Sequence, residues 1–257
     1  MPYFRGQGKL LAGLRDATTS YPLDLRWVGN CPELKVGFST TKLEHKESYS
    51  GNNLTDVQII TEKKATLSCV LEDFSKENLA LLFNGVAAQA TGTTPVTGYT
   101  LLGSSTPTVG QFFMLPRRNL SNVTIKDSTS GTAKTLTADT NYRLYTKEGM
   151  IEILDVTTGG AFTGPLLADF TPAASSEVAM FNAAAQDMWF RFLGMNMSNN
   201  GLPVVVDLFK VQLDPSKELS LIGDDIAKFT LEGSVLMDPL RASNDVLGQF
   251  GHVTILA

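Results

Sequence analysis

The stretch "DVQIITEKKATLSCVLED", residues 56–73, alternates apolar and polar side chains over most of its length. Successive side chains of a β-strand point to opposite faces, so this pattern predicts one long strand with a dry face and a wet face. The apolar face comprises Val57, Ile59, Ala65, Leu67, Cys69 and Leu71. The polar face comprises Gln58, Glu62, Lys64, Thr66, Ser68 and Glu72. A strand of this kind belongs to a sheet that borders water on one side.

Further strands are predicted on both sides of this stretch. "YPLDLRWVGN" (21–30) and "CPELKVGFST" (31–40) precede it, and "TTKLEHKESYSGNNLT" (40–55) reads as a long polar loop between strands. Strands are also predicted at 203–213 and 228–237, the latter with Thr230, Glu232 and Ser234 on its polar face. The clearest helix is 75–84, with Ser75 as N-cap and Gly85 as its stop.

The chain therefore reads as mainly β, a β-sandwich or partial barrel with one flanking α-helix. Residues 1–20 are weakly patterned and are predicted to form an N-terminal arm. A first part of the main domain covers 21–102, and a second part with a C-terminal arm covers 173–257. Between them, 103–172 shows short strands with regular turn signals, which predicts a small inserted β-sandwich.

Composition limits the possible functions. The 257 residues carry a formal net charge of −5, which disfavours tight nucleic-acid binding because phosphate neutralisation needs clustered Lys and Arg. Cys31 and Cys69 are predicted to be free thiols in or near a core, with a disulfide between them as the open alternative. No signal-peptide pattern and no apolar run of membrane-spanning length occurs, so we expect a chain made and folded in a cytoplasm.

The sequence offers no constellation for catalysis. His45 and His252 are the only histidines, and no GxSxG, HExxH, GxxxxGK[ST] or GxGxxG motif is present. Asp224 and Asp225 follow Gly223 in a stretch that reads as a solvated turn rather than a metal site. We therefore predict no catalytic residues, no metal ligands, no cofactor and no enzymatic activity.

The order of two separated blocks carries a resemblance to a known family. "LEDFSKENLALLFNG" (71–85) follows the long strand, and "FRFLGMNM" (190–197) and "VVVDLFKVQLDPSKELSLIGDDIAKFTLEGSVLMDP" (204–239) stand near the C-terminus. This arrangement resembles the tail tube proteins, or major tail proteins, of long-tailed bacteriophages, most of all those of siphophages. The resemblance covers roughly residues 22–100 and 175–240, and the segment 103–172 resembles the Ig-like decorations that tail proteins carry.

The resemblance implies a structural virion protein. Six copies would close into a ring, and stacked rings would form the tail tube through which the genome is delivered. The long loop would contact the adjacent ring through Leu43, Glu44, His45, Lys46, Glu47, Tyr49, Asn52 and Asn53. The polar faces described above, Gln58, Glu62, Lys64, Thr66, Ser68, Glu72, Thr230, Glu232 and Ser234, would line the lumen or, alternatively, face outside solvent.

Partners and location follow from the same resemblance. The chain would bind itself, the tape measure protein, the tail terminator and the distal tail or baseplate proteins. Double-stranded DNA would pass through without specific binding, and no membrane is involved. The protein would reside in the virion tail after assembly in the cytoplasm of the bacterial host. Acidic side chains on the wall would repel DNA phosphate.

Other readings stay open. A distal tail ring protein or a secretion-tube subunit would share the fold. A β-sandwich adhesion or carbohydrate-binding module would show clustered aromatic side chains beside polar turns, whereas Trp27 and Trp189 lie in strand patterns typical of a core.

Overall fold

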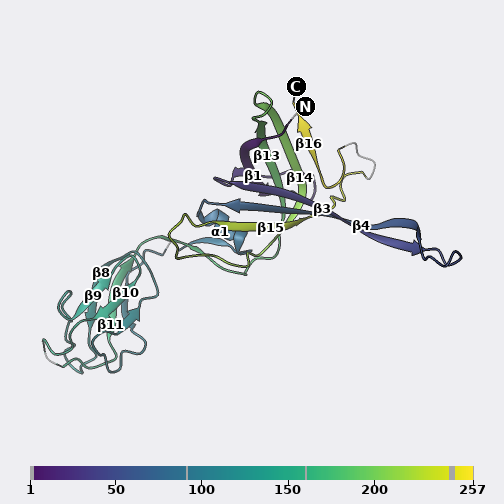
Figure 1. Ribbon diagram of the computed structural model, residues 1–257. Helices are drawn as coiled ribbons and strands as arrows, with labels where there is room; N and C mark the ends of the chain where they lie inside the picture. The colour runs from purple at the N-terminus through teal and green to yellow at the C-terminus, as the bar shows by residue number, and fades with distance from the viewer. Residues whose placement is uncertain (1–2, 91, 160, 243–246, 257) are drawn as a thin grey trace. The chain divides into compact units, whose positions relative to one another are not determined.

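The structure, a computed structural model, describes residues 3–90, 92–159, 161–242 and 247–256. The chain divides into two compact units, which are coloured by position along the chain in Figure 1. Unit 1 comprises Met1–Ala87 and Val178–Ala257, and unit 2 comprises Ala88–Glu177. Strands dominate the described residues, with a single α-helix among them, which confirms the predicted mainly-β fold class.

Unit 1 is built on one antiparallel sheet. Its strands are β1 (Gly6–Leu14), β2 (Arg26–Trp27), β3 (Glu33–Lys46), β4 (Thr55–Leu71), β13 (Asp187–Asn196), β14 (Leu202–Asp214), β15 (Phe229–Val235) and β16 (Gly251–Ile255). Their order is β2-β1-β13-β14-β15-β4-β3, and β16 pairs with β14 as well. Strand β14 joins two halves of the sheet, because Val204–Leu208 pair with β16 and Val211–Asp214 pair with β15.

The core of unit 1 is assembled from both chain segments of the unit. Leu67 and Leu71 of β4 pack in one cluster with Phe190 of β13, Val211 of β14 and Phe229 of β15. These side chains are the inward-facing members of alternating strands, as the period-two pattern requires. Within the same unit, Cys69 is buried and Cys31 half-buried, and both are free thiols.

The helix α1 (Lys76–Leu82) packs its buried residue Leu82 against this core. Ser75 is its N-cap, and the Ser75 hydroxyl accepts a hydrogen bond from the Asn78 N–H at 3.4 Å. The buried Asn78 side chain donates hydrogen bonds to the carbonyl oxygens of Val28 (2.8 Å) and Asp73 (3.0 Å). Burial of this amide is therefore compensated, and it ties the helix to the preceding loop.

The termini are strands rather than the arms predicted from the sequence. β1 pairs with β13 from Gly6↔Asn196 to Leu14↔Met188, and β16 pairs with β14. Glycines hide the pattern of β1: a Cβ at Gly8 would lie only 2.2 Å from the Leu193 carbonyl oxygen. The small residue permits close backbone approach but contributes nothing to the apolar alternation that sequence reading depends on.

The strand predicted at 21–30 is also reduced, to the two residues of β2. Leu23 and Trp27 are exposed, although the alternation places both on a buried face. Only Trp189 of the two tryptophans belongs to the interior, where its ring stacks on Tyr21. The segment turns around β1 instead, because the Leu23 N–H donates to the Leu14 carbonyl oxygen.

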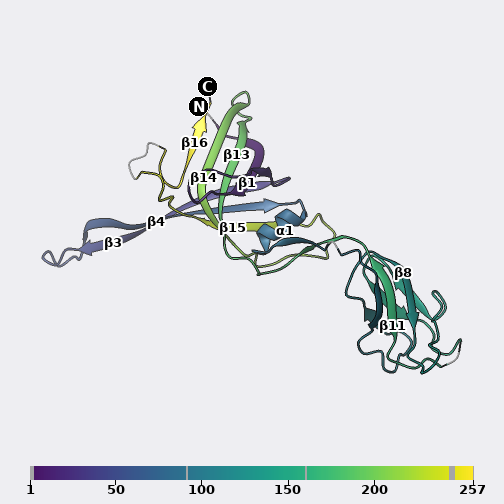
Figure 2. The ribbon, with the colours of Figure 1, turned by 180° about the vertical axis from the view of Figure 1, so that it is seen from behind.

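Strands β3 and β4 form a hairpin that extends beyond the core of unit 1. They remain paired from Glu33↔Val70 to Lys46↔Thr55, and on β4 every residue from Thr55 to Lys64 is exposed. Figures 1 and 2 show the hairpin leaving the rest of the unit 1 sheet in both views. The region 40–55 is thus not the loop predicted from its polar composition. Its residues up to Lys46 are strand, and only 47–54 form the connection.

Unit 2 has two three-stranded sheets around its own core. One sheet has the order β6-β11-β8 and the other β7-β10-β9. The strands are β6 (Val96–Thr100), β7 (Phe112–Met114), β8 (Leu120–Lys126), β9 (Tyr142–Tyr145), β10 (Met150–Ile153) and β11 (Leu167–Pro172). Phe113, Ile125, Ile151 and Phe170 are buried between them.

The boundaries of unit 2 differ from those predicted for the insertion, 103–172. Strand β6 lies within 21–102, the range predicted for the first part of the main domain, yet it pairs with β11 of unit 2. Strands β5 (Ala87–Ala90) and β12 (Ser175–Val178) form a two-stranded sheet where the chain passes between the units. The Ala179 N–H donates to the Val86 carbonyl oxygen at 3.1 Å, so the chain leaves and re-enters unit 1 at one place.

Candidate functional site

The residues predicted to contact a neighbouring ring lie at the far end of the β3–β4 hairpin. Leu43, Glu44, His45 and Lys46 end strand β3, and Glu47, Tyr49, Asn52 and Asn53 belong to the connection. All of these except Glu47 are exposed. The structure thus brings them together on a single projecting element.

Glu47 organises the connection from inside. Its carboxylate is buried and accepts hydrogen bonds from the N–H groups of Tyr49 (2.9 Å), Ser50 (2.8 Å) and Leu54 (3.4 Å), and from the Ser50 hydroxyl. The Ser50 hydroxyl and these N–H groups hold the pKa of Glu47 below its ordinary value. Gly51 (φ 80°) and Asn53 (φ 53°) supply the left-handed conformations that the turn needs. Glu47 therefore acts within the hairpin rather than as a contact residue.

His45 and Asp56 face each other across the same hairpin, with 2.6 Å between His45 Nδ1 and an Asp56 carboxylate oxygen. The hydrogen bond to His45 keeps the pKa of Asp56 below its ordinary value. Nowhere in residues 3–90, 92–159, 161–242 and 247–256 do three or more His, Cys, Asp or Glu side chains gather in a way that could hold a metal ion. Both residues are well exposed, as expected for a surface pair.

A β-bulge divides the hairpin into a base, next to the core, and a tip, and one face of the hairpin is polar on the base and apolar on the tip. The register shifts between Thr41 and Lys42, so that Glu62 pairs with Thr41 while Ile60 pairs with Lys42. Thr61 is the extra residue, and its hydroxyl donates to the Thr41 carbonyl oxygen at 3.1 Å. One extra residue exchanges the two faces of a strand. Gln58 consequently lies on the face opposite Glu62. The prediction that all the polar residues of this strand share one face is therefore wrong for Gln58.

Val57 and Ile59 are exposed because this part of the hairpin extends beyond the core, and the bulge decides which face they occupy. On the base of the hairpin, the face carrying Lys64 and Glu62 is polar, whereas beyond the bulge the same side carries Ile59 and Val57. Leu43 pairs with Ile59 and extends this apolar side on β3. Val57, Ile59 and Ile60 are three apolar residues in an otherwise polar hairpin, but the alternation predicts that Val57 and Ile59 belong to the buried face of the strand.

The polar faces of β4 and β15 do form one surface. Directly paired residues of antiparallel strands point to the same side, and Ser68 pairs with Glu232 while Thr66 pairs with Ser234. Thr230 lies on this side beside Val70. Strand β3 continues the surface, because Lys35 and Gly37 pair with Ser68 and Thr66.

The charges on this polar surface are paired rather than acidic throughout. Three glutamates of this surface, on β4, directly after β4 and on β15, each have a lysine within ion-pair distance: Glu62 with Lys64 (3.2 Å), Glu72 with Lys228 (3.5 Å) and Glu232 with Lys217 (2.9 Å). The hydrogen bond to Glu232 raises the pKa of Lys217. Lysine side chains therefore largely balance the negative charge that the acidic net charge of the chain led us to expect on this face.

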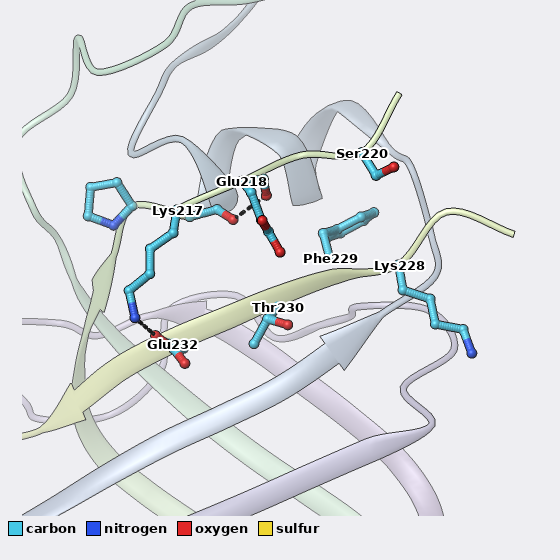
Figure 3. A pocket seen from close by; sticks show the side chains of 9 residues that line it. Lys217, Glu218, Ser220, Lys228, Phe229, Thr230 and Glu232 are labelled. Atoms are coloured by element: carbon cyan, nitrogen blue, oxygen red, sulfur yellow. Dashed lines mark hydrogen bonds and ion pairs between the residues drawn. The ribbon is translucent and has the colours of Figure 1, made fainter. Parts of the chain in front are cut away.

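A shallow pocket of about 340 Å³ lies on the same surface (Figure 3). Figure 3 shows the segment of residues 215–220 running beside β15, with Lys217 and Glu218 on the segment and Thr230 and Glu232 on the strand. The dashed contact from Lys217 to Glu232 crosses between them. The side chains that line the pocket carry both positive and negative charges, which suits a hydrated surface rather than a site for a single charged ligand.

An apolar groove opens on the opposite side of the base of the hairpin, and sequence reading missed it. The groove has a volume of about 280 Å³ and lies where β3 and β4 face β14 and β16. Its lining includes Val36, Phe38, Ala65, Val206, Phe250 and Val253. Phe38 is 81% and Val253 63% exposed, so the groove is a continuation of the core that none of the described residues of this unit covers.

Strand β16 is fixed beside this groove by a buried carboxylate. Asp207 accepts hydrogen bonds from Trp189 Nε1 (3.2 Å) and from Arg191 Nε (2.6 Å) and Nη2 (3.0 Å). The His252 ring on β16 approaches the same carboxylate at 3.5 Å and lies against the Phe209 ring. The hydrogen bond from Arg191 to Asp207 raises the pKa of Arg191. His252 is therefore a structural residue of this strand pair.

None of the helices in the described part of the chain has the length and apolar character required to cross a membrane. No curated protein matches the chain. A family model does match, over residues 3–254, and its description is Protein of unknown function UCP028589. Because the match covers nearly the entire sequence, the chain belongs to this family.

Proposed function

We propose that this protein is a structural subunit of a tail tube, in which copies of the chain form rings and the rings stack into a conduit for DNA. The observation that carries the proposal is the β3–β4 hairpin. It projects beyond the core and exposes Leu43, Val57 and Ile59. Exposed apolar groups on an ordered element mark an interaction surface, because their burial against a partner is favourable.

The sheet edges of unit 1 support an assembly of many copies. Strand β3 is an edge strand of 14 residues, and β2 ends the sheet on the other side. Long free edges invite pairing with another chain and are covered in proteins that stay monomeric. Pairing with neighbouring copies would satisfy the free N–H and C=O groups of these edges.

The polar surface of β3, β4 and β15 supports a lumen wall. Its threonines and serines are interspersed with lysine–glutamate pairs, so that a passing duplex meets no continuous positive charge. DNA binds proteins chiefly through clustered Lys and Arg on phosphate. A charge-balanced wall would therefore let DNA move without specific binding.

The proposal locates the protein in the tail of a virion assembled in the host cytoplasm. The tape measure protein, the tail terminator and the distal tail or baseplate proteins are its partners in that setting. It has no catalytic role and needs no cofactor. The related reading, a distal ring or secretion-tube subunit, predicts rings or shorter cylinders instead of long tubes.

The direct test is electron microscopy of the purified protein, combined with sedimentation velocity. We expect rings and cylinders of uniform width at high protein concentration. A protein that stays monomeric over the whole accessible concentration range contradicts the proposal. Single rings that never stack would favour the distal ring reading.

A second function, adhesion to carbohydrate, is favoured by one surface of unit 2. Phe112 and Tyr145 lie 6.2 Å apart between ring centroids on the β7-β10-β9 sheet. Between them Glu152 accepts hydrogen bonds from the Tyr145 hydroxyl (2.9 Å) and Arg143 Nη1 (3.3 Å). Aromatic faces beside charged hydrogen-bonding groups suit the apolar and hydroxyl faces of a sugar ring.

Calorimetric titration of the protein with bacterial surface polysaccharides tests this second function. Binding that is lost in Phe112→Ala and kept in Phe74→Ala, an exposed phenylalanine of unit 1, would support it. Equal binding by both variants would contradict a site on unit 2.

A further inference from the structure

The tip of the hairpin carries a small apolar patch, here called the tip patch, made of Leu43, Val57 and Ile59. Leu43 and Ile59 are directly paired, and Val57 is two residues along on the same side. They are 60%, 46% and 55% exposed, respectively. Glu47 and the ladder of β3 and β4 hold the patch in place, so its solvent exposure does not result from a loose segment.

The apolar groove at the base of the hairpin could receive such a patch. Its volume is about 280 Å³, and its walls are almost entirely apolar side chains such as Val36, Phe250 and Val253. A cavity of about 150 Å³ lined by apolar groups accommodates a benzene molecule. The groove therefore has room for about two aliphatic side chains delivered from outside.

One copy of the chain does not bring these two surfaces together. Phe38 borders the groove, and Leu43 is five residues farther along the same strand, which is about 17 Å at 3.3–3.4 Å per residue. The two strands are paired over this interval, so the tip does not fold back. The tip patch and the groove also lie on opposite faces of the hairpin, since Phe38 faces the core side and Leu43 the other side.

One charged side chain at the edge of each surface has the sign that would attract the other: a lysine at the groove, and at the tip patch an aspartate that is bonded to His45. Lys63 lies beside Phe38 and Phe250 at the edge of the groove, and it makes no ion pair within the residues that the structure describes. Asp56 adjoins the tip patch next to Val57, and its pKa is held low by the hydrogen bond to His45. Asp56 is therefore ionised at neutral pH and would attract Lys63 of a second copy.

We propose that the tip patch of one copy inserts into the apolar groove of a second copy in the adjacent ring. The ring arrangement rests on the proposed function, whereas the pairing of patch and groove rests on the two surfaces themselves. The contact is heterologous, because one copy offers the tip and the other the groove. Contacts of this kind propagate from copy to copy and do not close within a pair. The stack of rings would lengthen through this contact.

Two neighbouring isoleucines allow a matched test. Ile59 and Ile60 are similarly exposed, at 55% and 51%, but lie on opposite faces of the hairpin. Ile59→Glu places a charge in the docked patch, whereas Ile60→Glu places the same charge on the face that does not dock. Val253→Glu blocks the groove, and Phe38→Glu is a second groove variant at a site 81% exposed.

The readouts are circular dichroism, sedimentation velocity and tube counts by electron microscopy. We expect Ile59→Glu and Val253→Glu to fold and form rings, with the tube yield reduced at least tenfold. Ile60→Glu should form tubes as the unmodified chain does. A mixture of Ile59→Glu and Val253→Glu rings should give stacks of two rings only, since one supplies an intact groove and the other an intact tip.

Several results would overturn the inference. Normal tubes from Ile59→Glu, or equal loss of tubes in Ile59→Glu and Ile60→Glu, would show that the tip patch is not specifically docked. A mixture that yields no paired rings would exclude the groove as the receiving surface. In each of these cases the unmodified chain still forms tubes and the proposed function stands. An unmodified chain that never assembles would overturn both.

Discussion

Arg15 and Asp238 form a buried ion pair although 223 residues separate them in the chain. Arg15 Nη2 lies 2.5 Å from one carboxylate oxygen, Arg15 Nε donates to the other at 3.3 Å, and the Ser20 hydroxyl donates to Asp238 as well. Burial raises the pKa of Asp238, but the hydrogen bonds from Ser20 and Arg15 outweigh it and leave the pKa lowered. This pair joins the end of β1 to the segment after β15.

The first prediction concerns this pair. Arg15→Met should lower the free energy of unfolding by about 1.5–3 kcal/mol, because the buried Asp238 carboxylate loses its charged hydrogen bonds to Arg15. The neighbouring cation Arg241, whose Nε lies 3.8 Å from Asp238, still compensates part of the charge. Lys35→Met removes an exposed partner of Glu33 and should cost less than about 1 kcal/mol. Chemical denaturation monitored by fluorescence measures both. Similar small losses in the two variants would mean that the Arg15 pair contributes little.

The second prediction concerns pH and unit 2. Asp127 is buried, and burial raises its pKa, yet the Thr129 hydroxyl and the N–H groups of Thr163, Lys134 and Thr129 lower it to about 2 overall. A carboxyl with a lowered pKa in the folded state stabilises above its unfolded pKa of about 3.9 and loses that contribution as pH falls toward 2.

Stability of unit 2 should therefore decline between about pH 4 and pH 2, and Asp127→Asn should make this decline shallower. The same substitution should cost about 1–3 kcal/mol at neutral pH, since an amide replaces a charged acceptor of several hydrogen bonds. Denaturant titrations at successive pH values provide the measurement. An unchanged pH profile in the variant would assign the acid sensitivity to other carboxyls.

The third prediction concerns the hairpin connection. Glu47→Gln should increase amide hydrogen exchange at Tyr49, Ser50 and Leu54, because the neutral amide is a weaker acceptor for their N–H groups. Global stability should change little, since the connection lies outside the core. Glu44→Gln, an exposed change on the same hairpin, serves as the control. Exchange rates that rise equally in both variants would rule out a specific role for Glu47.

The fourth prediction concerns the passage between the units. Replacing residues 88–177 with a short Gly/Ser bridge should leave unit 1 folded, because the Val86 carbonyl and the Ala179 N–H are already hydrogen-bonded at 3.1 Å. Circular dichroism and thermal unfolding test the folding, and electron microscopy tests assembly. Insoluble protein from this deletion would show that unit 1 depends on unit 2 for its stability.

The fifth prediction concerns the polar surface and depends on the proposed function. Replacing Glu62, Glu72 and Glu232 with Lys would also free their lysine partners, so the wall would become strongly positive. DNA release from assembled particles should slow, most at low ionic strength, because salt screens the attraction. The matched triple Gln variant should slow release less. Release that is unaltered at every salt concentration would locate this surface outside the lumen.

Sequence reasoning succeeded where side-chain alternation coincided with burial. The base of β4, from Ala65 to Leu71, follows the predicted pattern residue by residue, and β15 does likewise. In both strands one face meets a core and the other meets water, so hydrophobicity reports orientation directly. The mainly-β class followed from this agreement.

The same reasoning failed where orientation is decided by backbone details. Thr61 adds one residue to β4, and nothing in its identity distinguishes a bulge from ordinary strand. Gly8 belongs to a strand because the backbone of β13 lies close against it. A partner strand that is distant in the sequence leaves no trace in the local residue pattern. The apolar groove escaped prediction for a related reason, as Val36 and Val253 come from opposite ends of the chain.

Unit 1 consists of two chain segments, so during synthesis it cannot be completed until the second segment has been made. Unit 2 is contiguous and can fold as soon as it has been made, whereas β4 waits for β14 and β15 before its apolar face is covered. At translation rates of about 5–20 residues per second, unit 2 alone delays those strands by roughly 5–18 seconds. The hairpin tip thus precedes the groove, whose wall at Val206 and Val253 is made late. A nascent chain therefore displays its tip before its own groove is complete.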